Sequence, residues 1–533
     1  MTAPAWTAGA AVPGSDRTDT MNALWSLWAG VGAVAAGDPL RSTLLDYPHG
    51  GTLLTADLLG LLTAGPLVGL LGVDGAYTAL IALRIAAAGL AMEAFARALL
   101  RRRGVEEPWA PLFAGVAFAL SPIAMAFVHN GSAELTALMP VPLCGYLALR
   151  LIEDARPRWV IAMAGGLLLA ALASFYTLLA AGILAAGLLL VAPGSRGPRL
   201  LGLLLGALLV APWALTVHRA ATASDNLVGI KNPRELHLVR RTTGPADPRS
   251  YLLGGEFRSP DFRQISRYGE DFLHAPYLGV VLLGGALLVL RRRDRPGTGG
   301  LWVAGGAGLL FSLGPVLVFD ASPFLFADQR GVPLPYFLIE RLPGFSSLSL
   351  LWRLGLAAVV AGHALLAIAL AGRPLRQQLL VLAAILVEGQ LLAPSRGLPG
   401  AASTAEDPAL VALAAAPKGA VINFPVVGGR GYLFEQTVHG KPLAATLNFP
   451  NNDTGQRVWA ALIAAEGQGS AAFVEAADRI ARQTGVRYLV VHKDAEARPD
   501  QHDRAVVAVQ AALSPLAGDP AASAIVVYSL RRD

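Results

Sequence analysis

Long apolar runs separated by short polar segments fill most of the chain. Between Val73 and Pro394 these runs approach the roughly 20 residues that a helix needs to cross a bilayer about 30 Å thick. The pattern predicts an α-helical integral membrane bundle of about ten spans. They are expected at residues 75–99, 108–128, 134–151, 158–175, 177–192, 199–217, 276–290, 301–319, 349–371 and 376–393.

Two apolar stretches need a separate interpretation. The stretch Trp159–Ala192 is too long for one span, and we place a break at its only polar cluster, Ser174-Phe175-Tyr176-Thr177. The stretch Leu53–Leu71 is short and contains Gly60, Gly65 and Pro66. We expect it to lie on the membrane surface or to dip into it.

Arginines in alternate connecting loops give the orientation of the bundle. Lys and Arg collect on the cytoplasmic side of membrane proteins. The opposite, extracytoplasmic side then receives residues 1–74 as a first external loop, the long loop 218–275 within the bundle 75–393, the loop 320–348 and the tail 394–533. The arginines are Arg101–Arg103; Arg150, Arg156 and Arg158; Arg196 and Arg199; Arg291–Arg295; and Arg373 and Arg376.

The composition agrees with a membrane protein. Hydrophobic residues make up 54% of the 533 residues and charged residues 15%, against about 25% charged in a typical soluble domain. The net charge of +6 comes from loop arginines, which argues against a nucleic-acid partner. The single cysteine, Cys144, excludes an intramolecular disulfide and a cysteine-based zinc site.

The tail predicts a soluble α/β domain. Ala420–Val426, Tyr488–Val491 and Ala524–Leu530 have the composition of buried strands, and Phe473–Thr484 has helical spacing. Helix followed by strand is typical of an α/β layer. At the other end of the chain, Met1–Thr20 has no signal-peptide core. We therefore expect a further apolar helix to be encoded upstream of the first residue.

Several short motifs, taken in order, resemble bacterial GT-C membrane proteins, which take sugars from polyprenyl-phosphate donors. The motifs begin in the predicted first external loop and are listed for that loop at the end of this paragraph. Further along the chain they are Ser121-Pro122, Tyr277-Leu278-Gly279, Leu342–Ser346 with Arg353, and Gln436–Pro442 in the tail. The chain departs from the family at 347–353, where a second arginine is expected. The first-loop motifs are Asp19–Trp25, Trp28, Gly37-Asp38-Pro39, Tyr47-Pro48-His49-Gly50 and Asp57.

The resemblance implies a glycosyltransferase of the bacterial inner membrane. It would move a sugar, with inversion, from a polyprenyl-phosphate donor to a lipid, glycan or protein acceptor on the outer face, with the tail helping to hold the acceptor. In this family the first-loop Asp is the essential carboxylate, which points to Asp19 as the catalytic base. From position alone, Asp19 is equally suited to cap the Trp-bearing helix Met21–Val34.

Glu134 is the second catalytic candidate. It opens a predicted helix five residues after His129, and the two side chains could hold a divalent cation such as magnesium or manganese, or orient a sugar. The alternative is a glutamate favoured at a helix start by the helix dipole.

Three further residues are candidates for binding the donor. Arg353 lies near the outer end of an apolar helix, where a charge needs a partner such as a lipid phosphate or must reach the headgroups. Asp57 could reach the same cavity, or lie on a solvated face. Arg267, with Arg258 and Arg263, is a weaker phosphate candidate because loop arginines are usually solvated.

The competing interpretation is a non-catalytic protein of the same fold, or a lipid or polymer transporter. A transporter would depend on charges inside the membrane. Arg84 and Glu93 lie on opposite sides of one predicted helix, so each needs a partner elsewhere. His363 and Glu388 raise the same question.

Overall fold

The computed structural model describes residues 10–530 except 16–17, 54–56, 228–232, 253–272, 274–275, 292–296, 320–321, 327–330, 343, 393–399, 425–429, 446–459, 461–463, 465–467, 494–506, 508 and 511–512. The chain divides into two compact units: residues 1–20, 56–216 and 231–401, and residues 21–55, 217–230 and 402–533. Parts of the predicted first loop and of the 218–275 loop belong to the same unit as the tail, and the division into 1–74, 75–393 and 394–533 stays a prediction.

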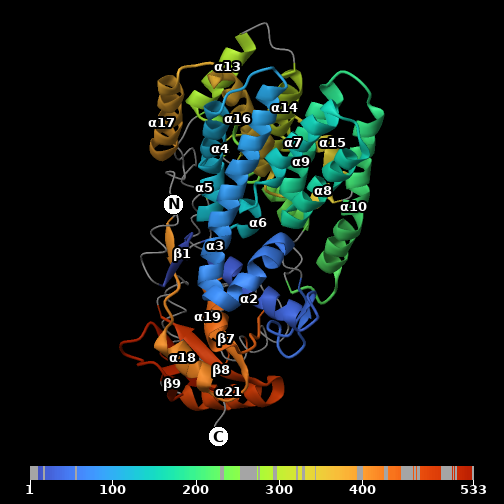
Figure 1. Cartoon of the computed structure of the whole chain (residues 1–533). Helices are drawn as coiled ribbons and strands as arrows, with labels where there is room; N and C mark the ends of the chain where they lie inside the picture. The colour runs from blue at the N-terminus through green and yellow to red at the C-terminus, as the bar shows by residue number, and fades with distance from the viewer. Residues whose placement is uncertain are drawn as a thin grey trace. The chain divides into compact units, whose positions relative to one another are not determined.

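The first unit is a helical bundle (Figure 1). Short elements connect its helices: β1 (Ala11–Pro13), α11 (Pro233–Val239), η1 (Pro248–Tyr251), β4 (Val318–Phe319), β5 (Ser322–Pro323), α15 (Tyr336–Ile339), η2 (Phe345–Ser347) and η3 (Leu351–Gly355). The main helices are α3 (Leu58–Arg101), α4 (Trp109–Ala119), α5 (Pro122–His129), α6 (Ala133–Thr136), α7 (Pro140–Glu153), α8 (Pro157–Ala173), α9 (Phe175–Val191), α10 (Gly197–Thr222), α13 (Val280–Arg291), α14 (Gly299–Ser312), α16 (Leu356–Leu370) and α17 (Leu375–Leu391).

Five helical segments within the described residues are long and apolar enough to cross a membrane. They are Leu58–Arg101, Trp109–His129, Ala133–Glu153, Gly197–Thr222 and Leu351–Leu370. Four shorter apolar helices accompany them: α8, α9, α13 and α14. The chain is therefore a helical membrane protein, and the count of ten spans stays a prediction.

Prolines and glycines divide several of the predicted spans. The span at 108–128 is two helices, because Pro122 has no backbone N–H to continue α4. The span at 134–151 is divided in the same way before Pro140. The span at 301–319 ends early, at Ser312, where Gly314 takes a left-handed φ of 78°. The predicted break between α8 and α9 falls at Ser174, as expected.

The predicted surface helix and first span form one long element. Helix α3 contains a non-helical residue, Gly72, with φ 69° and ψ 178°. Glycine adopts this conformation without the steric penalty that a side chain brings. The sequence therefore sets a bend between the two predicted segments.

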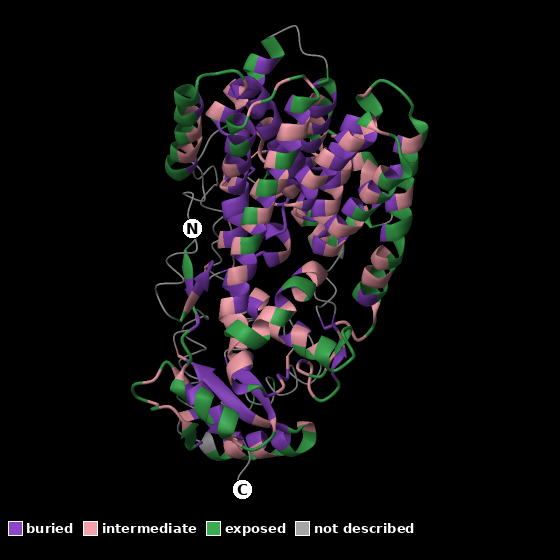
Figure 2. Ribbon diagram, in the orientation of Figure 1, coloured by how far each residue is buried: buried purple, intermediate pink, exposed green. Residues whose placement is uncertain are grey.

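Burial separates the centre of the bundle from its outer helices (Figure 2). Every residue of α16 except Gly362 is buried. In α17 only Gln378 and Gly389 are buried, and on α10 Leu204 and Leu208 are 62% and 70% exposed. A helix that exposes leucines to this extent needs an apolar solvent, which a bilayer provides.

Small residues let the central helices approach closely. A Cβ atom on Gly115 of α4 would lie 2.6 Å from the carbonyl oxygen of Gly89 on α3. Close backbone contact at small residues is the usual way in which helices associate inside membranes. The glycine- and alanine-rich composition therefore has a direct packing role.

The second unit is built on a four-stranded sheet with strand order β7-β8-β10-β9. Strands β7 and β8 are parallel, and the other neighbours are antiparallel. The three predicted strands match β7, β8 and β10, and the predicted helix lies within α21. The elements are α2 (Thr20–Ala35), β2 (Arg41–Ser42), β3 (Gly51–Thr52), β6 (Ala401–Ser403) at the border between the units, α18 (Pro408–Ala415), β7 (Ala420–Phe424), α19 (Arg430–His439), α21 (Ser470–Thr484), β8 (Val486–His492), β9 (Pro515–Ala517) and β10 (Ile525–Ser529).

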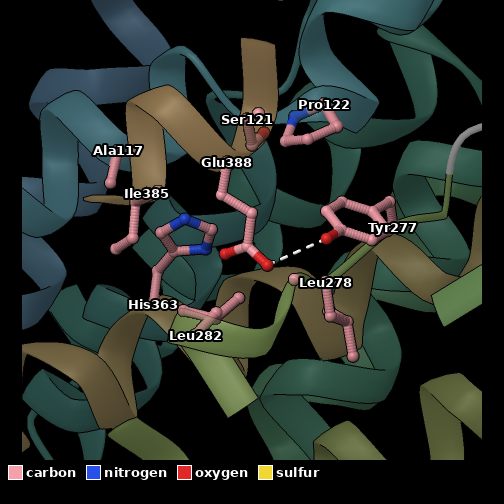
Figure 3. Close-up of a pocket in the computed structure, with 11 residues that line it drawn as sticks. Ala117, Ser121, Pro122, Tyr277, Leu278, Leu282, His363, Ile385 and Glu388 are labelled. Carbon is pink, nitrogen blue, oxygen red and sulfur yellow. Dashed lines mark hydrogen bonds between the residues drawn. The ribbon is translucent and has the colours of Figure 1, made fainter. Parts of the chain in front are cut away.

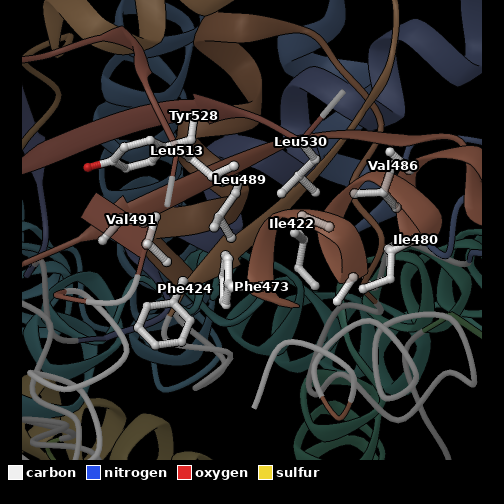
Figure 4. Packing of buried hydrophobic residues seen from close by; sticks show 14 of the residues in the cluster. Ile422, Phe424, Phe473, Ile480, Val486, Leu489, Val491, Leu513, Tyr528 and Leu530 are labelled. Atoms are coloured by element: carbon white, nitrogen blue, oxygen red, sulfur yellow. The ribbon is translucent and has the colours of Figure 1, made fainter. Parts of the chain in front are cut away.

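Both faces of this sheet are covered. On one face, Ile422, Phe424 and Val491 pack against Phe473 and Ile480 of α21 (Figure 4). The other face, which includes Val421, Tyr488, Val490 and Val527, packs with α18 and with Trp25 of α2. Successive residues of a strand point to opposite faces, so β7, in which all five residues are buried and four are apolar, suits a sheet buried on both sides.

Candidate functional site

Asp57 and Arg84 form an ion pair in the first unit. Arg84 Nη1 donates to Asp57 Oδ2 and Nη2 donates to Oδ1, both at 2.8 Å. The side chains are only 19% and 7% exposed, respectively. Asp57 Oδ1 also accepts from Gly60 N at the start of α3, and Arg84 Nη1 donates to Ala133 O. Asp57 therefore does not lie on a solvated face, and the pair ties α3 to the start of α6.

The segment that precedes α2 is held against the turn that follows α5. Thr18 Oγ1 donates to His129 O at 3.0 Å, and Asp19 N donates to Asn130 O at 3.0 Å. Thr18 is fully buried, whereas Asp19 and His129 keep some exposed surface. The backbone contacts therefore fix the position of Asp19 and leave its side chain partly accessible.

The turn itself depends on Gly131 and Asn130. Gly131 has a left-handed φ of 62°, and a Cβ atom there would lie 2.1 Å from Thr20 N, so only glycine allows this approach. The Asn130 side chain donates from Nδ2 to Leu273 O at 2.9 Å and accepts from Leu273 N at 2.7 Å. The Asn130 side chain therefore joins the turn to the backbone at Leu273, and we call this pair of hydrogen bonds the Asn130 clamp.

Glu134 is under the influence of three other charged side chains. Those of Asp19, Asp57 and Arg353 act on the Glu134 carboxyl group. Asp19, Asp57 and Glu134 also act on the hydroxyl of Tyr77, which is buried and has no hydrogen-bond partner among the described residues. Asp19, Glu134 and Arg353 are partly exposed. The first unit thus gathers carboxylates, a guanidinium and an unused hydroxyl at one place.

Arg353 is held by aromatic rings. Its guanidinium carbon lies 5.0 Å from the centre of the Tyr176 ring and 5.8 Å from that of Trp352. The Tyr176 hydroxyl accepts from Ser349 N at 3.1 Å and from Leu350 N at 3.0 Å. Arg353 Nε is buried and has no hydrogen-bond partner in the part of the chain that the structure describes. Its cation is therefore positioned by stacking and retains N–H donors for an anion.

The predicted site residues thus have different positions. Asp19, Asp57, Glu134 and Arg353 share one electrostatic neighbourhood, and His129 contributes a backbone oxygen to the same turn. Arg267 lies outside the described residues, as do Arg258 and Arg263.

A metal ion at His129 and Glu134 stays a prediction. Within the described residues, no three side chains of His, Cys, Asp or Glu are grouped as a metal site would require. Magnesium and manganese usually take about six oxygen-rich ligands. These two side chains would therefore need water or substrate to complete the coordination.

Two tyrosines of the site were missed at the sequence level. Tyr77 and Tyr176 are polar groups inside long apolar runs, and such groups usually have a buried partner or a ligand. The sequence pattern around Tyr176 indicated only a break between two helices. In both cases, a tyrosine hydroxyl within an otherwise apolar run was the feature that could have indicated a site residue.

Comparison with solved structures gives the fold. Over 98% of this chain and 38% of the other, the chain resembles arabinofuranosyltransferase AftD from Mycobacteria, with a TM-score of 0.54 and 18% identity. The chain has a GT-C fold. It spans less than half of the length of AftD.

Two further solved structures match with TM-scores below 0.5. ArnT from Cupriavidus metallidurans, bound to undecaprenyl phosphate, matches with a TM-score of 0.47 and 14% identity, over 99% of this chain and 96% of that one. AglB, the archaeal oligosaccharyltransferase from Archaeoglobus fulgidus, matches with a TM-score of 0.47 and 12% identity, over 93% and 67%. No protein-family model matches the chain, and no curated protein matches it.

Elsewhere in the GT-C bundle, Glu388 has a structural role. Its carboxylate accepts from the Tyr277 hydroxyl at 2.8 Å (Figure 3). It also accepts from Val280 N at 2.5 Å and from Val281 N at 3.1 Å. It therefore caps the first turn of α13, where free N–H groups favour an anion. The surrounding pocket is lined by Ala117, Ser121, Pro122, Tyr277, Leu278, Gly279, Leu282, His363, Ile385, Glu388 and Gly389.

The other intramembrane polar groups of the GT-C bundle also have local partners. Glu93 pairs with Arg97 one turn along α3. His363 Nδ1 lies 2.8 Å from Val359 O, and the His363 ring meets the edge of Phe118. Together with the Asp57–Arg84 pair, these contacts account for each residue that a transporter would use.

In the second unit, the Gln436–Pro442 motif forms a network of buried hydrogen bonds. Trp25 Nε1 donates to Gln436 Oε1 at 2.7 Å. Gln436 Nε2 donates to Leu44 O at 2.7 Å and to Lys441 O at 3.0 Å. Gln436 is fully buried, and these bonds satisfy its amide. The motif therefore ties α2 and the first-loop backbone to the tail sheet.

His439 in the same motif predicts that the protein loses folding stability in acid. His439 is buried and its Nδ1 accepts from Lys441 N at 3.0 Å. Burial and the Lys441 charge lower the pKa of His439 to about 4. An unfolded histidine has a pKa near 6.5, so this stabilisation is present above pH 6.5 and is lost as the pH falls towards 4.

We expect wild-type protein to lose roughly 2.5 kcal/mol more than a His439→Asn variant between pH 7.5 and 4.5. The Asn oxygen keeps an acceptor close to Nδ1 and cannot take a proton in this range. Denaturant melts of both proteins at the two pH values provide the measurement. Equal losses would contradict a neutral, buried His439.

Proposed function

We propose that this protein transfers a sugar from a polyprenyl-phosphate donor to an acceptor hydroxyl at the membrane surface, with inversion. The proposal rests on one observation: in a membrane bundle, the charges of Asp19 and Arg353 act on the Glu134 carboxyl group, and those of Asp19 and Glu134 act on the Tyr77 hydroxyl, which is buried and has no hydrogen-bond partner among the described residues. The GT-C fold shared with an arabinofuranosyltransferase supports the reaction class.

In the proposed reaction, the Asp19 carboxylate accepts the proton of the acceptor hydroxyl as its oxygen attacks the anomeric carbon. General-base catalysis of this kind typically contributes a factor of 10²–10⁴. The bond between that carbon and the phosphate oxygen breaks, and the lipid phosphate leaves with the electron pair. The Arg353 guanidinium, with its unused Nε donor, stabilises the phosphate as it departs.

The other residues position these groups. The partly exposed Glu134 hydrogen-bonds to the sugar, while the Asp57–Arg84 pair holds the beginning of α6 in place. In this proposal ten helices span the bacterial inner membrane. The tail lies on the extracytoplasmic side as an α/β domain and helps to hold the acceptor.

The direct test compares envelope glycans of a strain that lacks the gene with those of its parent. We expect one sugar type to be reduced or lost, and to return when the wild-type gene is restored. Membranes from the restored strain should transfer radiolabelled sugar from polyprenyl-phosphate donors, and membranes from the deletion strain should not. Identical glycans and identical transfer would refute the proposal.

The transporter alternative has weaker support. Arg84, Glu93 and Glu388 each have a local partner, whereas an ion pathway needs groups that can exchange partners. A non-catalytic protein of the same fold stays as the second candidate. In that case, a strain carrying an Asp19 variant would have normal envelope glycans, whereas a strain lacking the gene would not.

A further inference from the structure

Four polar side chains meet at one edge of the tail sheet, far in sequence from the residues above. Asn423 lies near the carboxyl end of β7, and His492 ends the neighbouring parallel strand β8. Glu435 and Tyr432 come from α19. Ligands of open α/β sheets usually bind beyond the carboxyl ends of parallel strands. The location is therefore one where this class of fold places binding sites.

His492 Nε2 lies close to two oxygen atoms there. His492 Nε2 lies 3.2 Å from Asn423 Oδ1 and 3.4 Å from Glu435 Oε2. A hydrogen bond from a ring N–H to oxygen is usually 2.7–3.2 Å long, so one distance is at this limit and the other beyond it. Ligands bound tetrahedrally at about 2.0–2.2 Å lie roughly 3.3–3.5 Å from each other. The 3.4 Å separation from Glu435 Oε2 fits an edge of a metal polyhedron, and the 3.2 Å separation from Asn423 Oδ1 lies close to one while also allowing a hydrogen bond.

The cluster is buried, and one of its carboxylate oxygens has no hydrogen bond from a described residue. Asn423 and His492 are each 8% exposed, and the Glu435 side chain is 13% exposed. Glu435 Oε2 is inaccessible to water and accepts no hydrogen bond from any described residue. A buried carboxylate is costly unless it is protonated or neutralised by a cation, and burial, with the Asp407 charge, raises the pKa of Glu435 to about 8. A metal ion would meet that need and would use the same three atoms.

The orientation of His492 is also fixed in advance. The Tyr432 ring stacks on the imidazole, with the ring centres 4.3 Å apart and the planes 30° from parallel. Stacking holds the ring so that Nε2 faces the two oxygens. Metal sites depend on such supporting contacts, and their loss typically costs 10–100-fold in affinity.

We propose that Asn423, Glu435 and His492 bind a divalent metal ion in the tail-bearing unit. One imidazole nitrogen, one carboxylate oxygen and one amide oxygen favour zinc or manganese over magnesium or calcium, which prefer oxygen ligands alone. The ion joins α19 to the ends of β7 and β8 and so stabilises the tail. This role is independent of sugar transfer.

The test uses the full chain in detergent, freed of metal with a chelator. Zinc, manganese, magnesium and calcium are added separately, and bound metal and melting temperature are measured. We expect one equivalent of zinc or manganese to bind and raise the melting temperature, with magnesium and calcium at least tenfold weaker. Glu435→Gln and His492→Gln should each weaken binding at least tenfold, whereas His49→Gln, at an exposed histidine of the same unit, should not.

A gain-of-affinity variant covers the case in which those variants fail to fold. Asn423→Asp replaces the amide oxygen with a charged one of the same shape and should tighten binding at least tenfold. If the wild-type chain takes up no metal and Asn423→Asp gains none, the three side chains form a hydrogen-bonded cluster only and the proposal is wrong. Equal binding by wild type and His492→Gln would also overturn it.

Discussion

Asp19→Asn is expected to reduce sugar transfer by 10²–10⁴-fold, the usual contribution of a general base. Expression, membrane insertion and melting temperature should stay nearly unchanged. Asn has the size of Asp and can cap a helix equally well, and the Asp19 backbone bond to Asn130 does not involve the side chain. Transfer of labelled sugar by membranes that contain equal amounts of each protein provides the measurement.

Two further variants make this result specific. Glu134→Gln should cost as much as Asp19→Asn if the carboxylate holds sugar or metal, and little if it only favours a helix start, at about 0.3–1 kcal/mol. Glu93→Gln is the matched control, because Glu93 is a carboxylate of the same bundle whose partner, Arg97, lies on its own helix. Full transfer by Asp19→Asn together with loss in Glu93→Gln would favour a transporter.

Arg84→Met is expected to destabilise the protein by about 3–5 kcal/mol, since removal of one partner leaves a buried charge uncompensated. The change strands the Asp57 carboxylate and also removes the donor to Ala133 O. Thermal melting of purified protein in detergent would show the loss directly. Transfer activity measured below the melting temperature should fall much less than in Asp19→Asn.

Arg97→Met serves as the comparison for that loss. Its pair with Glu93 is 35% and 22% exposed, and half-exposed pairs one turn apart on a helix contribute only about 0.3–0.5 kcal/mol. The double variant Arg84→Met, Asp57→Leu should recover much of the loss because no charge stays buried. Equal melting of Arg84→Met and Arg97→Met would show that the Asp57–Arg84 pair contributes no more than an exposed one.

Much of the bundle was predictable because apolar length is a strong signal. The break at Ser174 and the strands of the tail sheet follow from the sequence pattern. Hydropathy averages over about twenty residues, however, so it cannot resolve a local backbone interruption. Pro122 and Pro140 each divided a predicted span, and Gly314 shortened another, although all three residues were visible in the sequence.

The site was predictable only where position along the chain carried the information. Asp19 and Glu134 begin helices, and the motif order drew attention to both. Their neighbourhood depends on contacts between distant segments, such as Asp57 with Arg84 across the bend at Gly72. The helical angle between Arg84 and Glu93 excluded a pair between them but could not name the partners. The sequence showed Glu388 as an intramembrane charge without an identified partner, and the structure shows that it caps helix α13.

The Asn130 clamp also matters for production of the protein in a eukaryotic host. Asn130-Gly131-Ser132 is an acceptor triplet for N-linked glycosylation. Asn130 is 1% exposed and both ends of its amide are bonded to Leu273, so a glycan can be attached only before this turn closes. A glycosylated fraction would therefore consist of chains that failed to fold here. Ser132→Ala would remove the triplet and leave the clamp in place.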